Sequence, residues 1–171
     1  MLEDSMLYAQ NEPVNNDLDA LFQTYGDMIY RLALVRTKSI ADSEDVVQEV
    51  FLRCLKNNPV FQSAEHQKAW LIKVTINCSK TILGNAFRRH SVPEDALGEL
   101  ATENESPDST VYDAVMQLPE KFRTVIHLYY YEEYSVKEIA VAMKTTESTV
   151  KSWLHRARGM LKETLGGEFD V

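Results

Sequence analysis

The amino-acid sequence predicts an all-α protein in which a flexible acidic linker joins two small helical bundles. Apolar residues recur at three- and four-residue spacing on both sides of the linker, which is typical of amphipathic helices. No segment alternates between polar and apolar residues as a half-buried strand does. Between residues 85 and 108 the helical spacing disappears, and Pro93, Gly98 and Pro107 interrupt an acidic, polar run.

The chain of 171 residues has room for two small domains. We expect an N-terminal domain at residues 17–84 and a C-terminal domain at residues 109–167, with the linker at 85–108 between them. Residues 1–16 are expected to be a disordered or loosely ordered N-terminus, and residues 168–171 a short tail.

Three helices are expected in the N-terminal domain. The first follows the apolar stripe between residues 18 and 32. The second is expected to begin near Asp42, because this side chain can cap the free amides of a first turn, and to end at residues 57–59. The third is expected to run from about residue 68 to residue 83, with its apolar residues on one face and its basic and amide side chains largely off it.

The C-terminal domain resumes with helical spacing at Val111. Pro119 is expected to be the first residue of a following helix, since proline lacks an amide that the first turn would leave unpaired. Residues 135–158 then predict a helix-turn-helix. Ser135 and Glu138 match a capping box at the start of its first helix, and residues 144–146 match a short turn.

The second helix of this motif has two distinct faces. Its apolar stripe consists of Val150, Leu154, Ala157 and Leu161. Opposite the stripe lie Ser148, Ser152, His155 and Arg156, with Lys151 at the edge. Short hydrogen-bonding side chains suit base edges and cations suit phosphates, so this pattern favours a DNA-recognition helix. The alternative is an ordinary helical hairpin with a polar outer face.

The charge distribution favours two nucleic-acid-facing segments. The net charge of −8 would argue against such a partner if it were evenly spread. It is uneven, because residues 66–93 and 151–162 contain bases and no acid, whereas residues 92–108 contain acids and no base. Each basic segment alone could equally be a solvated helix face.

Several other classes of protein find no support in the sequence. No apolar stretch has the roughly 20 residues of a membrane helix, and the first twenty residues are acidic, unlike a secretory signal. We therefore expect a cytoplasmic protein without membrane insertion. Cys54 and Cys78 lie in separate apolar patterns and no metal-ligand spacing, so we expect buried reduced thiols, no metal site and no cofactor.

Four ordered segments resemble the extracytoplasmic-function (ECF) sigma factors of bacterial RNA polymerase. They are DSEDVVQEVFLR from Asp42, AWLIKVTINCSK from Ala69, LPEKFRTVIHL from Leu118 and TVKSWLHRAR from Thr149. Their order and spacing match too, over about residues 18–165. The resemblance implies a factor that binds core polymerase and directs promoter-specific initiation, with an N-terminal domain for the −10 element and a C-terminal domain for the −35 element.

The resemblance also implies a role for particular residues. Asp45, Gln48 and Glu49 would dock on the clamp helices of the polymerase β′ subunit, and the β subunit is a further expected contact. The −10 region would use Lys73, Asn77, Lys80, Arg88 and Arg89, together with the loop at 58–67. The −35 region would use Ser148, Thr149, Lys151, Ser152, His155 and Arg156. An anti-sigma factor is a candidate partner because family members are often held by one.

The sequence departs from the family pattern at a few positions. Lys144 replaces the usual glycine of the turn, Ser148 replaces a frequent glycine, and Trp153 replaces a frequent arginine. Thr81 stands where an aspartate is frequent. These departures bear on the promoter preference and leave the expected fold unchanged.

Two alternative functions fit parts of the sequence less well. A helix-turn-helix regulator that does not bind core polymerase would fit residues 135–158 but gives the segment from Asp42 no role. An enzyme would need acid-base groups such as His127, Glu132 and Glu133, but no nucleophile, metal spacing or phosphate-binding glycine loop accompanies them. We therefore expect no catalytic activity.

Overall fold

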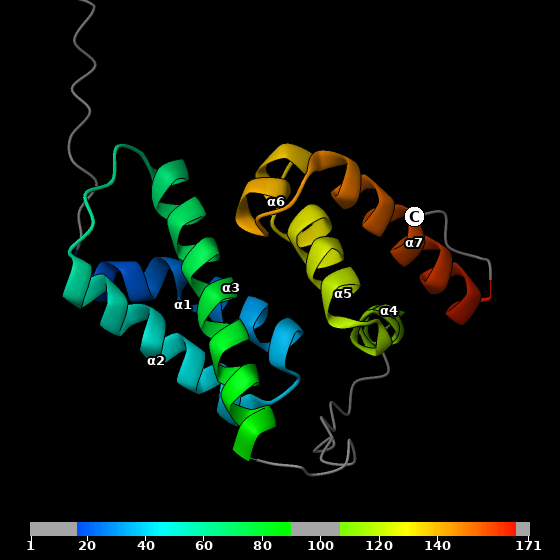
Figure 1. Cartoon of the computed structure of the whole chain (residues 1–171), viewed down its shortest axis with the longest axis horizontal. Helices are drawn as coiled ribbons and strands as arrows, with labels where there is room; N and C mark the ends of the chain where they lie inside the picture. The colour runs from blue at the N-terminus through cyan, green and yellow to red at the C-terminus, as the bar shows by residue number, and fades with distance from the viewer. Residues whose placement is uncertain (1–16, 90–106, 167–171) are drawn as a thin grey trace, which may run out of the picture.

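The computed structural model describes residues 17–89 and 107–166, and every regular element within them is helical (Figure 1). This confirms the predicted all-α fold. The expected tails at 1–16 and 168–171 and most of the expected linker lie outside the described residues.

Three helices form the N-terminal bundle: α1 (Leu18–Thr37), α2 (Ile40–Asn57) and α3 (Ala64–Arg89). All three pack against one another around a fully buried apolar interior. The start of α2 differs from the prediction. The cap is Ser39, whose hydroxyl accepts a hydrogen bond from the Asp42 amide at 3.2 Å, so Asp42 is a first-turn acid and not the cap.

Helix α3 is longer than the sequence pattern predicted at both ends. It begins at Ala64 and reaches Arg89, so residues 85–89 are helical and do not belong to the linker. No proline interrupts the last turns, and Arg88 and Arg89 suit the negative end of the helix dipole. The helix therefore persists beyond the point where its apolar spacing fades.

The C-terminal bundle contains α4 (Pro107–Gln117), α5 (Glu120–Ile126), α6 (Val136–Ala142) and α7 (Glu147–Thr164). Pro119 is the cap of α5 rather than its first residue. Between α5 and α6 the chain forms a π-helix, η1 (His127–Tyr131), which the sequence did not predict. Here the Glu132 amide donates to the His127 carbonyl, five residues back, at 3.2 Å.

The two cysteines are free and buried, as expected. Burial raises the pKa of the Cys78 thiol to about 11, and burial also raises the pKa of Cys54. Both side chains therefore remain neutral thiols inside the N-terminal bundle, where they pack as small apolar groups.

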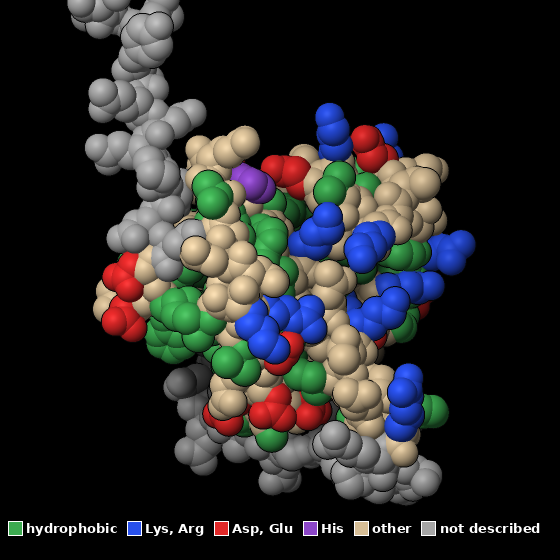
Figure 2. Space-filling model, turned by 60° about the vertical axis from the view of Figure 1, so that its left-hand side comes forward, with side chains coloured by type: hydrophobic (Ala, Val, Ile, Leu, Met, Phe, Trp, Pro, Cys, Tyr) green, Lys and Arg blue, Asp and Glu red, His purple; other side chains and the backbone are tan. Residues whose placement is uncertain are grey.

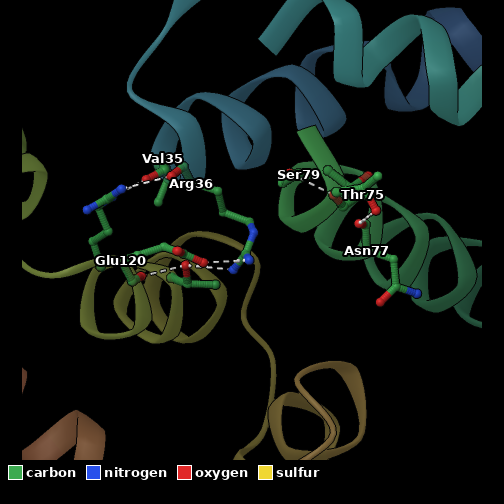
Figure 3. A network of polar contacts seen from close by, with 9 residues as sticks. Val35, Arg36, Thr75, Asn77, Ser79 and Glu120 are labelled. Atoms are coloured by element: carbon green, nitrogen blue, oxygen red, sulfur yellow. Dashed lines mark hydrogen bonds and ion pairs between the residues drawn. The ribbon is translucent and has the colours of Figure 1, made fainter. Parts of the chain in front are cut away.

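The two bundles pack directly against each other, α1 against α5 and α3 against α6. At the first contact, the Arg36 guanidinium lies 2.6 Å from the Glu120 carboxylate and donates to the Thr124 hydroxyl at 3.1 Å (Figure 3). In the reverse direction, Arg123 of α5 donates to the carbonyls of Val35 and Arg36 at the end of α1. These carbonyls would otherwise lack partners within their helix.

A second polar contact joins the start of α3 to the end of η1. The Lys68 ammonium lies 3.1 Å from the Glu132 carboxylate and also faces the ring of Tyr134. Burial favours the neutral acid, but the contacts with His127 and Lys68 hold the pKa of Glu132 below its ordinary value. Glu132 therefore carries a charge at the bundle interface near neutral pH.

The turn between α6 and α7 contains a left-handed residue whose conformation can be tested by substitution. Lys144 has a φ of 54°, in the left-handed region that costs a side chain about 1 kcal/mol or more and costs glycine little. Lys144→Gly should therefore raise the free energy of unfolding by about 0.5 to 1 kcal/mol, measured by urea denaturation.

The matched control is Lys151→Gly, an exposed position inside α7. There the same substitution should lower the free energy of unfolding by about 1 kcal/mol. Equal effects at the two positions would contradict the assigned turn.

Candidate polymerase and nucleic-acid interfaces

The helix-turn-helix is built as the sequence predicted. Ser135 and Glu138 form the capping box of α6, in which the Ser135 amide donates to the Glu138 carboxylate at 2.8 Å. Helix α7 buries its predicted apolar stripe of Val150, Leu154, Ala157 and Leu161. Because that stripe is fixed against the bundle, the opposite face of α7 must point outward.

The outward face of α7 carries most of the predicted −35 residues. Ser148, Lys151, Ser152, His155 and Arg156 are all exposed. Thr149 is half-buried, and its amide donates to the cap residue Thr146 at 3.2 Å. Thr149 therefore has a structural role at the start of the helix in addition to any contact with a ligand.

Two other α7 side chains face the protein. Trp153 is half-buried, packs against the core and has the Lys121 ammonium 5.6 Å from its ring centre. Arg158 donates to the Tyr130 hydroxyl at 2.8 Å and lies over the rings of Tyr129 and Tyr130. Arg158 is thus engaged in internal packing, whereas Lys151 and Arg156 are exposed cations of the outward face.

The molecule also separates its charges in space. Figure 2 shows Lys and Arg side chains gathered in the centre and right of the view, while Asp and Glu side chains lie mostly toward its left and lower edges. A chain with a net charge of −8 can therefore still present a basic surface.

Helix α2 presents the predicted polymerase-binding residues. Asp45 and Gln48 are exposed, and Glu49 is half-buried and paired with Arg53 at 2.9 Å. A hollow of about 370 Å³ lies on the α1 side of α2, and another of about 400 Å³ lies on the α3 side. Gln48 lines both hollows, so it stands on the ridge between two shallow grooves.

The same face carries two leucines that the sequence analysis did not single out. Leu52 and Leu55 are 53% and 59% exposed. At 100° per residue they fall on the side of α2 that holds Asp45 and Gln48. Leu52 lies seven residues after Asp45, and Leu55 lies seven residues after Gln48. This two-turn spacing could have placed the leucines on the same face from the sequence alone. The outward face of α2 therefore carries exposed apolar side chains beside its acids.

Helix α3 holds the predicted −10 residues along one edge. Lys73 and Asn77 are half-buried, and Lys80 and Arg88 are exposed. Arg89 is the last residue of α3, and its side chain lies outside the described residues. Figure 3 shows the Asn77 amide directed away from α1, whereas the Thr75 and Ser79 hydroxyls are buried and donate to carbonyls of their own helix.

The segment before this edge is only partly a loop. Residues 58–63 form it, and residues 64–67 already belong to α3. Gln67 is buried, so it is not available to a ligand. Trp70 is half-buried and meets the buried Phe61 ring edge-on at 5.7 Å, as a core anchor does. It also lines a hollow shared with α6.

No helix among residues 17–89 and 107–166 is long and apolar enough to cross a membrane. Nor do they contain a group of three or more His, Cys, Asp or Glu side chains that could hold a metal ion.

Comparison with known proteins finds two family models that match separate parts of the chain. Residues 21–91 match the model of sigma-70 region 2, and residues 109–161 match the model of sigma-70 region 4. The ECF RNA polymerase sigma factor SigL of Mycobacterium tuberculosis is 34% identical over 156 residues, covering 85% of this chain and 87% of SigL. The ECF RNA polymerase sigma factor SigW of Bacillus subtilis is 28% identical over 163 residues, covering 82% and 84%.

Two solved structures share the fold. The sigma factor RpoE of Bartonella quintana, in complex with the anti-sigma factor NepR, matches with a TM-score of 0.74 at 19% identity, covering 91% of this chain and 100% of that one. CnrH, in complex with the cytosolic domain of CnrY, matches with a TM-score of 0.59 at 19% identity, covering 89% of each chain.

Proposed function

The chain belongs to the ECF RNA polymerase sigma factors, and from that premise we propose which of its surfaces bind polymerase and which bind the promoter. It directs promoter-specific transcription initiation. One observation supports this assignment: α2 and α7 each bury one apolar stripe and expose the opposite face. The exposed faces differ in chemistry, so each suits a different partner.

The outward face of α2 binds core polymerase. Asp45, Gln48 and Glu49 meet basic side chains of the β′ clamp helices, and the β subunit contacts the factor elsewhere. Leu52 and Leu55 extend this surface by two turns, because burying two exposed leucines against a partner would add to the electrostatic attraction. The shallow grooves on either side of α2 would receive side chains of that partner.

The edge of α3 holds the opened strand of the −10 element. Lys73, Lys80, Arg88 and Arg89 supply positive charge for its phosphates, and Asn77 supplies an amide that can both donate and accept. Because Trp70 is packed on Phe61, base recognition here relies on the amide and on the loop at 58–63 more than on stacking with Trp70.

Helix α7 reads the −35 element. Ser148 and Ser152 lie toward its first turns and approach base edges, while Lys151, His155 and Arg156 contact phosphates. Thr149 contributes mainly by holding the helix start in place.

The partners proposed for this chain are therefore core polymerase and promoter DNA. An anti-sigma factor is a further proposed partner, supported by the complex of RpoE with the anti-sigma factor NepR. We propose no catalytic role and no cofactor for the chain itself, since polymerase supplies the phosphodiester chemistry. Its place of work is the cytoplasm, where polymerase acts. A helix-turn-helix regulator that does not bind core polymerase would have no partner for the α2 surface.

Run-off transcription with purified core polymerase and a promoter library tests this function directly. We expect transcripts from a subset of promoters only when the chain is present. DNA binding by the chain without any promoter-dependent transcript would favour the helix-turn-helix regulator instead.

The α2 surface makes a prediction about polymerase affinity. Asp45→Lys combined with Glu49→Lys should weaken core binding by about 2 kcal/mol or more, roughly 30-fold, because opposite charges become like charges. Leu52→Ala combined with Leu55→Ala should also weaken core binding. It should leave the free energy of unfolding nearly unchanged, since both leucines are exposed in the free chain.

Binding is measured by titrating labelled core polymerase, and unfolding by urea. The control is Glu163→Lys, an exposed acid in the last turn of α7. Core affinity that survives both α2 double substitutions would refute the proposed polymerase surface.

The α7 surface makes a prediction about salt and sequence dependence. Lys151→Ala and Arg156→Ala should each weaken binding to all −35 sequences alike and reduce the salt slope by about one per lost phosphate contact. Ser152→Ala should instead change which −35 sequence is preferred. The measurement is binding to −35 duplexes of different sequence over a series of salt concentrations. If Arg156→Ala and Ser152→Ala changed the sequence preference equally, the proposed division between phosphate and base contacts would be wrong.

A further inference from the structure

Helix α3 carries one continuous stripe of residues from the proposed −10 surface to its last turn. Lys73, Asn77, Lys80, Gly84 and Phe87 follow one another at alternate spacings of four and three residues. This spacing places all five on one face of the helix. The first three belong to the proposed −10 surface, so the stripe continues for two further turns beyond that surface.

The end of this stripe combines an apolar ring with positive charge. Phe87 is 85% exposed. A single exposed apolar side chain is common on protein surfaces and means little alone. Here, however, exposed Lys80 and Arg88 flank the ring, and the one acid of α3 is Glu65 in its first turn. An aromatic ring among cations suits a nucleic acid, whose phosphates attract the cations while its bases offer apolar surface.

A glycine inside the stripe gives a second, independent observation. Gly84 lies in the interior of α3, where glycine costs helix stability relative to alanine. A Cβ atom placed on Gly84 would meet no other atom within 4 Å, so packing among the described residues does not require the glycine. A ligand that approaches the backbone closely would require it. The bare step between Lys80 and Phe87 therefore indicates a close approach from outside.

This end of the stripe faces away from the proposed polymerase surface. Asn85 lines the hollow that also contains Asp45 and Glu49 of α2. Phe87 follows Asn85 by two residues, which places the two side chains about 160° apart around the helix. Helix α6 lies beside the start of α3 and not beside its last turns (Figure 1). Phe87 is therefore directed neither at the acids of α2 nor at α6.

The distance along α3 sets where such a contact would fall on a promoter. Phe87 lies ten residues after Asn77, or about 15 Å along the helix. At 3.4 Å per base pair, this length corresponds to at most about four base pairs of duplex. The chain continues from Arg89 toward the domain proposed for the −35 element, so the end of α3 points upstream. There the DNA is still double-stranded, and its major groove admits an α-helix.

We propose that Phe87 contacts the methyl group of a thymine in the duplex just upstream of the −10 element. Lys80 and Arg88 contact the flanking phosphates, and Gly84 lets the duplex approach the helix. Phenylalanine is one of the side chains that make apolar contact with the thymine methyl. Arg88 and Arg89 offset the negative end of the helix dipole, which would otherwise repel phosphates. The proposal rests on the proposed function, because it takes α3 as the helix that binds the −10 element.

Exchange of thymine for deoxyuridine tests the contact, because it removes one methyl group and leaves every hydrogen-bonding group in place. The promoter is one selected by run-off transcription, and apparent affinity is measured with polymerase reconstituted from core and the full chain. In a series of duplexes, each of the first few base pairs upstream of the −10 element carries thymine or deoxyuridine on either strand. We expect deoxyuridine at one of these positions to weaken binding about four-fold, the effect of returning one methyl group to water.

Variants of α3 assign the effect to its residues. Phe87→Ala should bind both duplexes as weakly as wild type binds the deoxyuridine duplex, whereas Phe87→Leu should keep most of the difference. Tyr131→Ala removes another exposed aromatic ring, outside the proposed binding surfaces, and should leave the difference unchanged. Gly84→Leu should weaken binding to both duplexes several-fold. It should not lower the Tm of the free chain, because leucine favours helix and the site is open.

Several results would overturn the contact while the proposed function stands. One is equal affinity of wild type for thymine and deoxyuridine at every position, and another is a difference that survives Phe87→Ala. Weaker core binding by Phe87→Ala with an unchanged methyl effect would place the ring against polymerase instead. A folded Gly84→Leu variant with wild-type promoter affinity would overturn the close approach. If wild type supported no promoter binding by polymerase at all, the proposed function would fail, and the contact with it.

Discussion

The structure depends on the complete burial of one apolar stripe on each of the helices α2 and α7. Val46 and Val50 fix α2 in the N-terminal bundle, and Val150 and Leu154 fix α7 in the C-terminal bundle. A helix whose stripe is buried has no freedom to rotate, so the opposite residues are held at defined positions on the surface. The surfaces that we propose for polymerase and promoter binding therefore take their geometry from the buried residues beneath them.

Structural features that depend on residues close together in the sequence were predictable. Features that depend on contacts between residues far apart in the sequence were not. The apolar stripes of α2 and α7 and the capping box of α6 depend on residues within a few positions of one another, and the structure confirms them. The cap of α2 was misassigned because Ser39 and Asp42 both have suitable side chains. The end of α3 was missed because its last turns have no buried stripe and are helical for reasons of dipole and backbone.

The docking of the two bundles could not have been inferred from the sequence. Arg36 and Arg123 resemble ordinary surface cations at the end of one helix and within another, yet each is buried by the opposite bundle. Their partners are 84 to 88 positions away, beyond any local periodicity. The positive φ of Lys144 was also not predicted, because only the usual glycine of the family, and not the lysine itself, indicates a left-handed backbone at this turn.

The π-helix at His127–Tyr131 has a consequence for how this domain can vary. A π-turn is equivalent to one residue inserted into an α-helix, and it rotates everything downstream by about 100° relative to an uninterrupted helix. This rotation directs Glu132 toward Lys68 and leaves Tyr131 exposed. The direction in which α6 and α7 leave this segment is therefore set by a single extra residue. A one-residue change of length here would reorient the whole proposed DNA-binding face at once and leave each of its side chains unchanged.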